Sequence, residues 1–180
     1  NIAFAVRARF VLLRDLGSSL SPTNAFHLIQ GLETLPLRYR EHQANAQKVA
    51  NFLNSKPEVK KVIYPNIQDS EEDRKRANKY LENGNGPLVG FELNGGKEAG
   101  KQFIDNLKMI YHVANIGDVR TLAIHPASTT HSQLSEEDQL KAGVTPGYIR
   151  LSVGIEYIDD ILEDIDQAIS NIDKSDKKVA

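Results

Sequence analysis

Four short runs of β-branched and aromatic residues, each bounded by turn-forming residues, constrain the fold of this chain most strongly. They lie at residues 59–64, 88–93, 109–113 and 148–153. Runs of this kind are typical of β-strands. Segments with helical patterns separate them, at residues 71–81, 97–107 and 135–141. Together these elements favour an α+β fold, in which helices cover one face of a small sheet.

The clearest helical pattern lies near the end of the sequence. Apolar residues recur at three- and four-residue intervals between Ile158 and Ile169, and acidic residues occupy the other side. This spacing predicts a helix that packs one face on a core.

A long helix is predicted from about residue 22 to about residue 54. Ser21 can cap its N-terminus, and Pro22 fits the first helical position, where a missing N–H costs nothing. Pro36 should bend this helix, because proline cannot donate the helical hydrogen bond. Residues 2–13 form a further, mostly apolar segment that predicts a helix whose exposed apolar side needs a partner.

Composition excludes several classes of function. The chain has 180 residues, and its 22 basic and 24 acidic residues are interspersed with a net charge of -2, so it lacks the basic stripe that nucleic-acid binding needs. No apolar run approaches the roughly 20 residues of a membrane span, and no signal-peptide pattern is present, which predicts a cytoplasmic protein. Cysteine is absent, which excludes disulfides, thiolate metal ligands and a cysteine nucleophile.

Arg150 is the strongest candidate for binding a ligand. In the alternating run 149–153 it shares a strand face with Ser152, opposite the apolar residues. A guanidinium matches a carboxylate with two parallel hydrogen bonds, so Arg150 could orient an acidic group. The strand pattern alone equally allows an arginine that faces solvent.

Three other polar residues are candidates for binding a ligand or a metal ion. Asn115 precedes Gly117 in a turn that could aim its amide at a ligand, although a plain turn asparagine fits the same pattern. His125 and His131 could share a metal ion, but no third ligand is spaced with them. We therefore predict no metal site.

Three motifs follow one another in the second half of the chain. They are Asn-Ile-Gly-Asp-Val-Arg-Thr-Leu at 115–122, His-Pro-Ala-Ser-Thr-Thr-His at 125–131 and Ile-Arg-Leu-Ser-Val-Gly-Ile-Glu at 149–156. In this order they resemble the pyridoxal-phosphate-dependent enzymes of cysteine and methionine metabolism. The resemblance is closest to the O-acetylhomoserine sulfhydrylases. It covers nearly the whole chain, because the segments 12–17, 21–26 and 31–35 also match.

The resemblance implies a division into domains. Residues 1–20 would end the cofactor domain, residues 21–55 would form a connecting helix, and residues 56–180 would form a C-terminal α+β domain with a largely antiparallel, four-stranded sheet. In similar enzymes the Schiff-base lysine, the phosphate cup and the aspartate facing the pyridine nitrogen lie upstream of the matched segments. The resemblance thus implies that the parent enzyme uses pyridoxal phosphate, while this chain binds none and is inactive by itself.

The resemblance also implies roles for individual residues. The arginine matching Arg150 holds the substrate α-carboxylate, and the residue at Asn115, a serine in related lyases and synthases, assists it. Arg120 favours the sulfhydrylases, since cystathionine-handling members carry glutamate there, although a surface arginine without a role in selectivity fits as well. The expected specificity or entrance-loop residues are Arg120, Thr121, His125, Ser128 and Thr130. Thr130 is expected to hold this loop by hydrogen bonds to the backbone.

The activity implied by the resemblance joins O-acetyl-L-homoserine with sulfide or a thiol, giving homocysteine or methionine and acetate, in a homotetramer. A methionine γ-lyase and a cystathionine γ-synthase are alternatives within the family. A non-catalytic interaction or ligand-binding module is an alternative from another class. The apolar residues 2–13 argue against that module, because a self-contained domain seldom starts with an uncovered hydrophobic helix.

Overall fold

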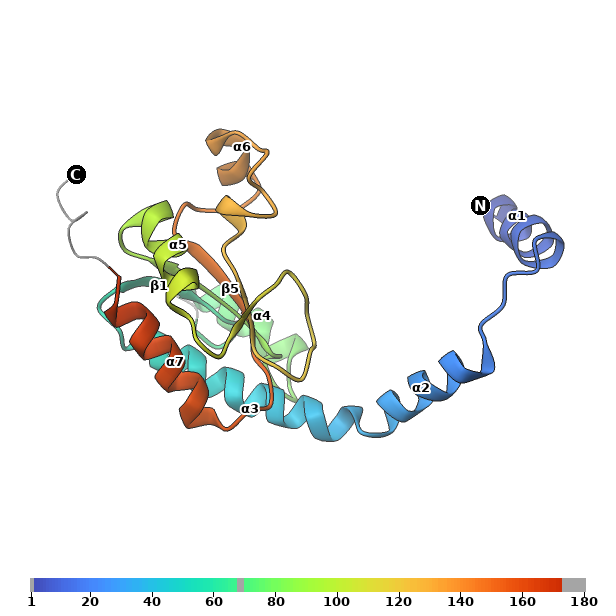
Figure 1. Ribbon diagram of the computed structural model, residues 1–180, viewed down its shortest axis with the longest axis horizontal. Helices are drawn as coiled ribbons and strands as arrows, with labels where there is room; N and C mark the ends of the chain where they lie inside the picture. Colours follow the sequence, from blue (N-terminus) through green and yellow to red (C-terminus); the bar gives the residue numbers. More distant parts are fainter. Residues whose placement is uncertain (1, 68–69, 173–180) are drawn as a thin grey trace. The chain divides into compact units, whose positions relative to one another are not determined.

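The computed structural model describes residues 2–67 and 70–172 (Figure 1). The chain forms two compact units, Asn1–Leu37 and Arg38–Ala180. This division falls inside the helical region that was expected to connect two domains at residues 21–55. The expected connecting helix is therefore divided about equally between the two units.

The first unit is helical. Helix α1 (Ile2–Arg7) continues into a π-helical segment, η1 (Ala8–Asp15), and α2 (Pro22–Glu33) follows after a turn. The Ser21 hydroxyl accepts the backbone N–H of Asn24 at 3.2 Å, so the predicted N-cap is confirmed.

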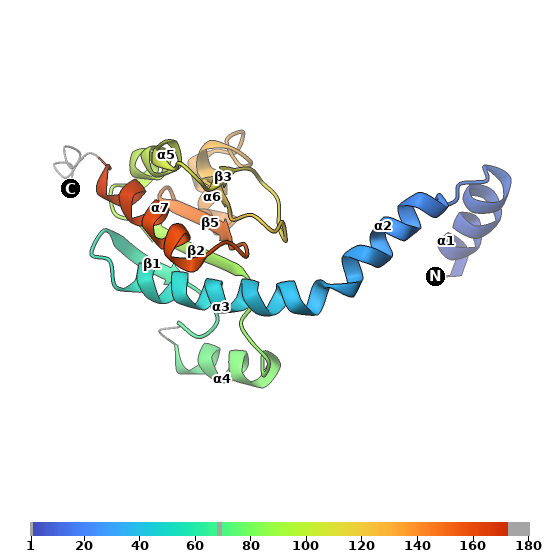
Figure 2. The same ribbon diagram turned by 60° about the horizontal axis from the view of Figure 1, so that its bottom comes forward.

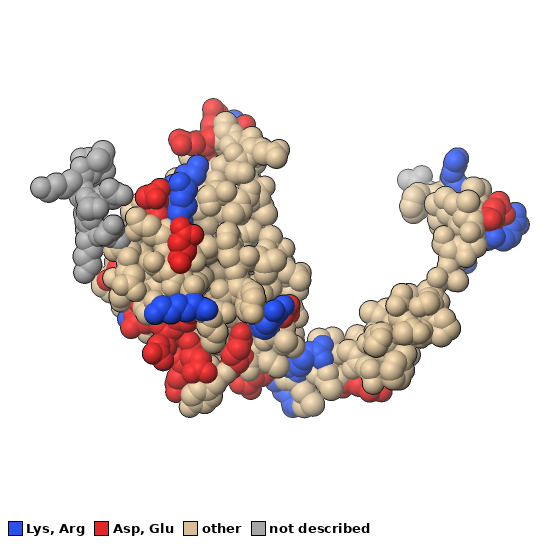
Figure 3. Space-filling view, in the orientation of Figure 1, with Lys and Arg blue, Asp and Glu red and all other residues tan. Residues whose placement is uncertain are grey.

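The apolar side chains of the first unit are largely exposed. No described residue of α1, η1 or α2 is buried, and Phe4 and Ile2 are 81% and 79% exposed. Uncharged atoms dominate the surface of α2 in the space-filling view (Figure 3). Because apolar groups are stabilised by removal from water, this surface is suited to contact with other protein atoms.

The helix predicted at 22–54 with a bend near Pro36 is divided there into two helices. Helix α2 ends at Glu33, and α3 (Leu35–Asn54) begins after Thr34, whose backbone angles of φ −101° and ψ 0° lie outside the helical values. Pro36 explains the interruption, because it has no N–H to donate to Leu32 and its ring would meet that carbonyl. A proline in the first turn of α3 avoids both problems.

The second unit contains a five-stranded sheet, one strand more than predicted. Its strands are β1 (Val59–Ile63), β2 (Leu88–Leu93), β3 (Tyr111–His112), β4 (Leu122–Ile124) and β5 (Tyr148–Ser152). Their order is β1-β2-β5-β4-β3, and every neighbouring pair is antiparallel except the parallel pair β3–β4. The α+β class is confirmed. Strand β4 was missed because three residues are too few to show a period of two.

One hydrophobic core joins the sheet to three helices. Helices α3, α5 (Gly96–Asn106) and α7 (Ile158–Ser170) lie beside the sheet (Figure 2). Their buried residues pack with alternate residues of β2 and β5. The rings of Phe91 on β2 and Phe103 on α5 meet edge to face, with centroids 5.4 Å apart. The predicted amphipathic helix is confirmed, since Ile161 and Ile165 are fully buried and acidic side chains gather on the outside of α7 (Figure 3).

Three short helices complete the second unit. They are α4 (Glu71–Tyr80), the 3₁₀ turn η2 (Pro126–Ser128) and α6 (Glu136–Lys141). Ser70 and Ser135 cap α4 and α6, and both helices carry three acidic residues in the first turn, where the helix dipole favours negative charge. Within residues 2–67 and 70–172, no helix is long and apolar enough to span a membrane.

Candidate functional site

Arg150 lies on the central strand of the sheet. It pairs with Gly90 of β2 on one side and with Ile124 of β4 on the other. Its neighbours Ile149 and Leu151 point into the core and are fully buried, so Arg150 points to the opposite face of the sheet. Arg150 is half-buried there, and its guanidinium contact to the loop is exposed, so some of its donors are within reach of a ligand.

A shallow cavity of about 290 Å³ opens beside Arg150 on this face. Arg150 lines it together with residues from β1, β2 and β5 and with the two residues after β1, namely Ile63, Tyr64, Pro65, Leu88, Gly90 and Tyr148. Burial raises the pKa of Tyr148, and the charge of Arg150 partly opposes the shift. Burial, with the nearby Tyr39, raises the pKa of Tyr64 to about 12. Both phenols are therefore neutral near pH 7, and Arg150 is the cationic group of this cavity.

Asn115 lies in the loop between β3 and β4, next to Arg150. Its backbone carbonyl accepts a hydrogen bond from Nη2 of Arg150 at 3.4 Å. Its side-chain oxygen accepts the N–H of Ile116 at 2.9 Å, which leaves the amide NH₂ as the group that can donate to a ligand. The two predicted binding residues thus come together, although they are 35 positions apart.

Ser152 fastens the same loop to β5. Its hydroxyl accepts the N–H of Gly117 at 3.1 Å, and Ser152 is 2% exposed. Gly117 has a φ of +81°, a left-handed conformation that glycine adopts without strain. The loop therefore turns sharply at the point where it meets the strand that carries Arg150.

Arg120 is engaged locally. Its Nε and Nη2 donate to the two carboxylate oxygens of Asp118 at 3.1 and 3.2 Å, and its guanidinium lies 4.5 Å from the ring centroid of Tyr111. The hydrogen bonds from Arg120 lower the pKa of Asp118. These contacts account for Arg120 without a ligand, which favours the reading as a surface arginine.

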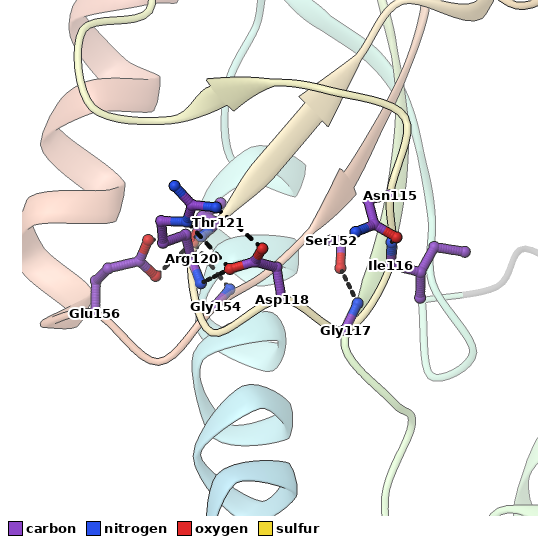
Figure 4. A network of polar contacts seen from close by, with 9 residues as sticks. All are labelled: Asn115, Ile116, Gly117, Asp118, Arg120, Thr121, Ser152, Gly154 and Glu156. Carbon is purple, nitrogen blue, oxygen red and sulfur yellow. Dashed lines mark hydrogen bonds and ion pairs between the residues drawn. The ribbon is translucent and has the colours of Figure 1, made fainter. Parts of the chain in front are cut away.

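Thr121 and Glu156 form a clasp at the other end of the loop (Figure 4). The Glu156 carboxylate accepts two hydrogen bonds from Thr121, one from the backbone N–H at 2.5 Å and one from the side-chain hydroxyl at 2.8 Å. The same hydroxyl oxygen accepts the N–H of Gly154 at 2.9 Å. Thr121 is completely buried, so its side chain binds the protein rather than lining an entrance.

Helix α3 holds the far end of β5. The Asn45 amide donates to the carbonyl oxygens of Gly154 and Glu156 at 3.2 and 2.9 Å. His42 lies 2.7 Å from the carbonyl oxygen of Val153 through Nδ1, which must donate because a carbonyl only accepts. The end of β5 is thus held by α3 as well as by the loop.

His125 is structural, contrary to its predicted place at an entrance. It is completely buried, with Nε2 2.7 Å from the carbonyl of Pro146 and Nδ1 2.7 Å from the hydroxyl of Ser128. Because that carbonyl only accepts, Nε2 carries the proton and neutral Nδ1 accepts from Ser128. Burial lowers the pKa of His125, and Lys97 and Lys101 add to the shift.

Thr129, rather than the predicted Thr130, bonds the backbone of the loop after β4. Its hydroxyl donates to the carbonyl of His125 at 2.8 Å, whereas the hydroxyl of Thr130 lies 2.9 Å from Nδ1 of His131. Thr130 is exposed and remains available at the surface. In the described part of the chain, no group of three or more His, Asp or Glu side chains could hold a metal ion.

Glu156 and Asn45 were not singled out from the sequence. Glu156 follows a strand and Asn45 lies in a helix, and neither sequence pattern predicts which residue the side chain will contact. Ser152 did carry a signal, because it shares the strand face of Arg150 two positions away.

Comparison with known proteins places these residues in a family. The family model for Cys/Met metabolism PLP-dependent enzymes matches residues 3–170. The O-acetyl-L-homoserine sulfhydrylase of Leptospira meyeri is 53% identical to 96% of this chain, which covers 39% of that protein. The O-acetyl-L-homoserine sulfhydrylase 1 of Thermus thermophilus is 47% identical to 94% of the chain, which covers 40% of it.

Solved structures agree. One from Campylobacter jejuni, provisionally assigned as an O-acetylhomoserine (thiol)-lyase, has a TM-score of 0.82 and 46% identity, with 94% of this chain and 40% of that chain covered. It carries N'-pyridoxyl-lysine-5'-monophosphate. The cystathionine gamma-lyase of Lactobacillus plantarum, complexed with L-serine, has a TM-score of 0.80 and 32% identity, with coverages of 96% and 44%.

A lysine that bonds to this cofactor needs a desolvated setting that lowers its pKa. Every lysine in residues 2–67 and 70–172 is exposed or half-buried. Lys56, among the half-buried ones, is engaged by Asp166 at 2.5 Å.

The chain spans about 40% of the length of the relatives it matches. The family model nevertheless extends over nearly all of it, and the solved relatives share its fold. On this evidence, the chain belongs to the pyridoxal-phosphate-dependent enzymes of cysteine and methionine metabolism.

Proposed function

We propose that this chain is the substrate-binding C-terminal part of an O-acetylhomoserine sulfhydrylase. Its complete enzyme would replace the acetoxy group of O-acetyl-L-homoserine with sulfide or a small thiol, releasing acetate. The names of the relatives that are 47–53% identical support this substrate. We further propose, from the same likeness, a homotetramer in the cytoplasm, and light scattering on the complete enzyme tests the tetramer.

The position of Arg150 carries the proposal. Arg150 lines the cavity on the sheet face opposite the core. One nitrogen of its guanidinium donates a hydrogen bond to the Asn115 carbonyl. A planar guanidinium can bind a carboxylate through two parallel N–H groups, which fixes the direction of the bound group as well as its place. Arg150 would therefore hold the substrate α-carboxylate, and the Asn115 amide would donate a further hydrogen bond.

The chemistry at the α-carbon belongs to the cofactor, which serves as an electron sink in enzymes of this kind. The contribution of this chain is orientation. Binding the carboxylate at a fixed place restricts the substrate to the geometry that reacts, which lowers the entropic part of the barrier.

Replacing Arg150 in the complete enzyme tests the proposal. We expect Arg150→Ala to raise KM for O-acetyl-L-homoserine roughly 10- to 100-fold, because a hydrogen bond to a charged group contributes about 1.5–3 kcal/mol. Arg150→Lys should recover only part of the loss, because it keeps the charge and loses the planar fork. Arg74→Ala, on exposed α4, is the matched control. An unchanged KM in Arg150→Ala would remove Arg150 from the site.

A lyase acting on cystathionine or methionine is the second candidate. The high structural likeness to the Lactobacillus plantarum cystathionine gamma-lyase favours testing it. A substrate panel separates the two, because a γ-lyase releases ammonia and a 2-oxo acid, whereas a sulfhydrylase consumes sulfide and releases acetate. Methionine γ-lyase and cystathionine γ-synthase activities are read in the same panel.

A further inference from the structure

The loop at residues 113–121 is fastened to β5 at two places. The first lies at the proposed carboxylate site, where Ser152 holds Gly117 at 3.1 Å and Arg150 contacts the Asn115 carbonyl. The second is the clasp of Thr121 and Glu156, beyond the end of β5. Figure 4 shows both places on the same loop, with Asn115 near one and Thr121 at the other.

The clasp leaves little freedom at its own end of the loop. The buried Thr121 hydroxyl both donates to Glu156 and accepts from the N–H of Gly154, so neither residue can shift alone. The N–H of Ile155 donates to the carbonyl of Val119 at 2.9 Å, which adds a backbone bond at the same point. The contact is also tight, because a Cβ on Gly154 would lie 2.5 Å from the Thr121 nitrogen.

The bond from Arg150 itself to the loop is weaker by comparison. The Arg150–Asn115 bond is 3.4 Å long, at the far limit for a hydrogen bond, and residues 111–117 are exposed. Exposed segments with few buried contacts move most easily. The strong, partly charged bonds at Thr121, together with the bond from Gly117 to Ser152, can therefore determine where the loop lies along β5.

We propose that Thr121 and Glu156 are positioning residues for carboxylate binding, whose clasp sets the distance between Asn115 and Arg150. This inference rests on the proposed role of Arg150. Neither residue touches the substrate. Each acts by keeping the Asn115 amide and the Arg150 guanidinium at a separation that one carboxylate can bridge.

Variants of Thr121 in the complete holoenzyme test this role. Thr121→Val keeps the shape and removes the hydroxyl, and we expect KM for O-acetyl-L-homoserine to rise roughly tenfold with kcat and cofactor content near those of the parent. Thr121→Ser keeps the hydroxyl and should restore most of the affinity. Glu156→Gln should also raise KM. The amide of the new residue keeps one oxygen that can accept a hydrogen bond from Thr121, but its NH₂ group replaces the oxygen that accepted the other one.

Coupling between the two residues is a second readout. If they act as one clasp, the Thr121→Val/Glu156→Gln double variant should raise KM by much less than the product of the single effects. Additive effects would contradict the clasp. If Thr121→Val fails to fold, KM of the Glu156→Gln variant is compared with that of the parent, and an unchanged KM would contradict the positioning role.

A pair of inhibitors makes the test specific for the carboxylate. L-norleucine and pentylamine differ by the carboxylate alone, so competitive inhibition by each can be measured in the same variants. Thr121→Val should raise the inhibition constant of L-norleucine roughly tenfold and change that of pentylamine by less than about twofold. The positioning role is overturned if Thr121→Val weakens inhibition by both compounds equally, or if it weakens inhibition by neither.

Arg150→Ala, measured in parallel, separates this inference from the proposed function. Selectivity here is the preference for L-norleucine over pentylamine. If Arg150→Ala loses this preference and Thr121→Val does not, only the positioning role fails. If Arg150→Ala does not lose it, the carboxylate site is elsewhere and both proposals fail.

Discussion

The carboxylate of Asp164, on α7, accepts the backbone N–H of Ile110 at 2.9 Å. The same carboxylate accepts the N–H groups of Lys108 and Met109 at 2.9 and 3.0 Å, and Asp164 is only 5% exposed. One buried side chain therefore satisfies three successive N–H groups of the segment between α5 and β3.

Asp164→Asn should lower the free energy of unfolding by about 2–3 kcal/mol, because an amide NH₂ would face backbone donors that are buried and then unsatisfied. Glu163→Gln, the same kind of change on the exposed side of α7, should change it by less than about 0.5 kcal/mol. Urea unfolding of the two variants measures the difference. Equal stabilities would contradict the role of Asp164.

The buried His125 should make stability depend on pH. Its pKa lies below the ordinary value of 6.5 in the folded chain, so the unfolded chain takes up the proton first as the pH falls. The contribution of neutral His125 is therefore complete above about pH 6.5 and declines below it. In His125→Gln the loss of stability between about pH 6.5 and 5 should be smaller than in the parent. His131→Gln is the control that should keep the parent slope.

Gly154 should tolerate no side chain. A Cβ there would lie 2.5 Å from both the Thr121 nitrogen and the Val119 oxygen, and these backbone atoms cannot turn aside. We expect Gly154→Ala to destabilise the chain by about 1–3 kcal/mol. Gly31→Ala, in α2 with open space around the new methyl group, should be neutral or stabilising by up to about 1 kcal/mol. Thermal unfolding of both variants provides the comparison.

Removal of residues 1–37 should leave the second unit folded. All buried residues of the described core come from position 42 onward, so the deletion removes none of them. We expect a cooperative thermal transition in the shortened chain and less binding of a hydrophobic dye, since the exposed apolar side chains of α1 and α2 are gone. A noncooperative transition would show that the first unit contributes to the core.

Much of the local structure was predictable because it depends on neighbours in the sequence. The three- and four-residue spacing of Ile161 and Ile165 marked α7, and alternation around Arg150 marked β5 and the face on which Arg150 lies. The bend predicted at Pro36 in the helix at 22–54 is a full interruption at Thr34, because the loss of one hydrogen bond and a steric contact outweighed the helical pattern on either side.

The sequence by itself determined the helices, the longer strands, the likeness to a family and the candidacy of Arg150, because each depends on residues that are close along the chain. The tertiary structure alone decided the strand order β1-β2-β5-β4-β3, the burial of His125 and the meeting of Thr121 with Glu156. Residues 35 positions apart have no common periodicity. Their contact follows from the pairing of β4 with β5, which the packing of the core against three helices holds in place.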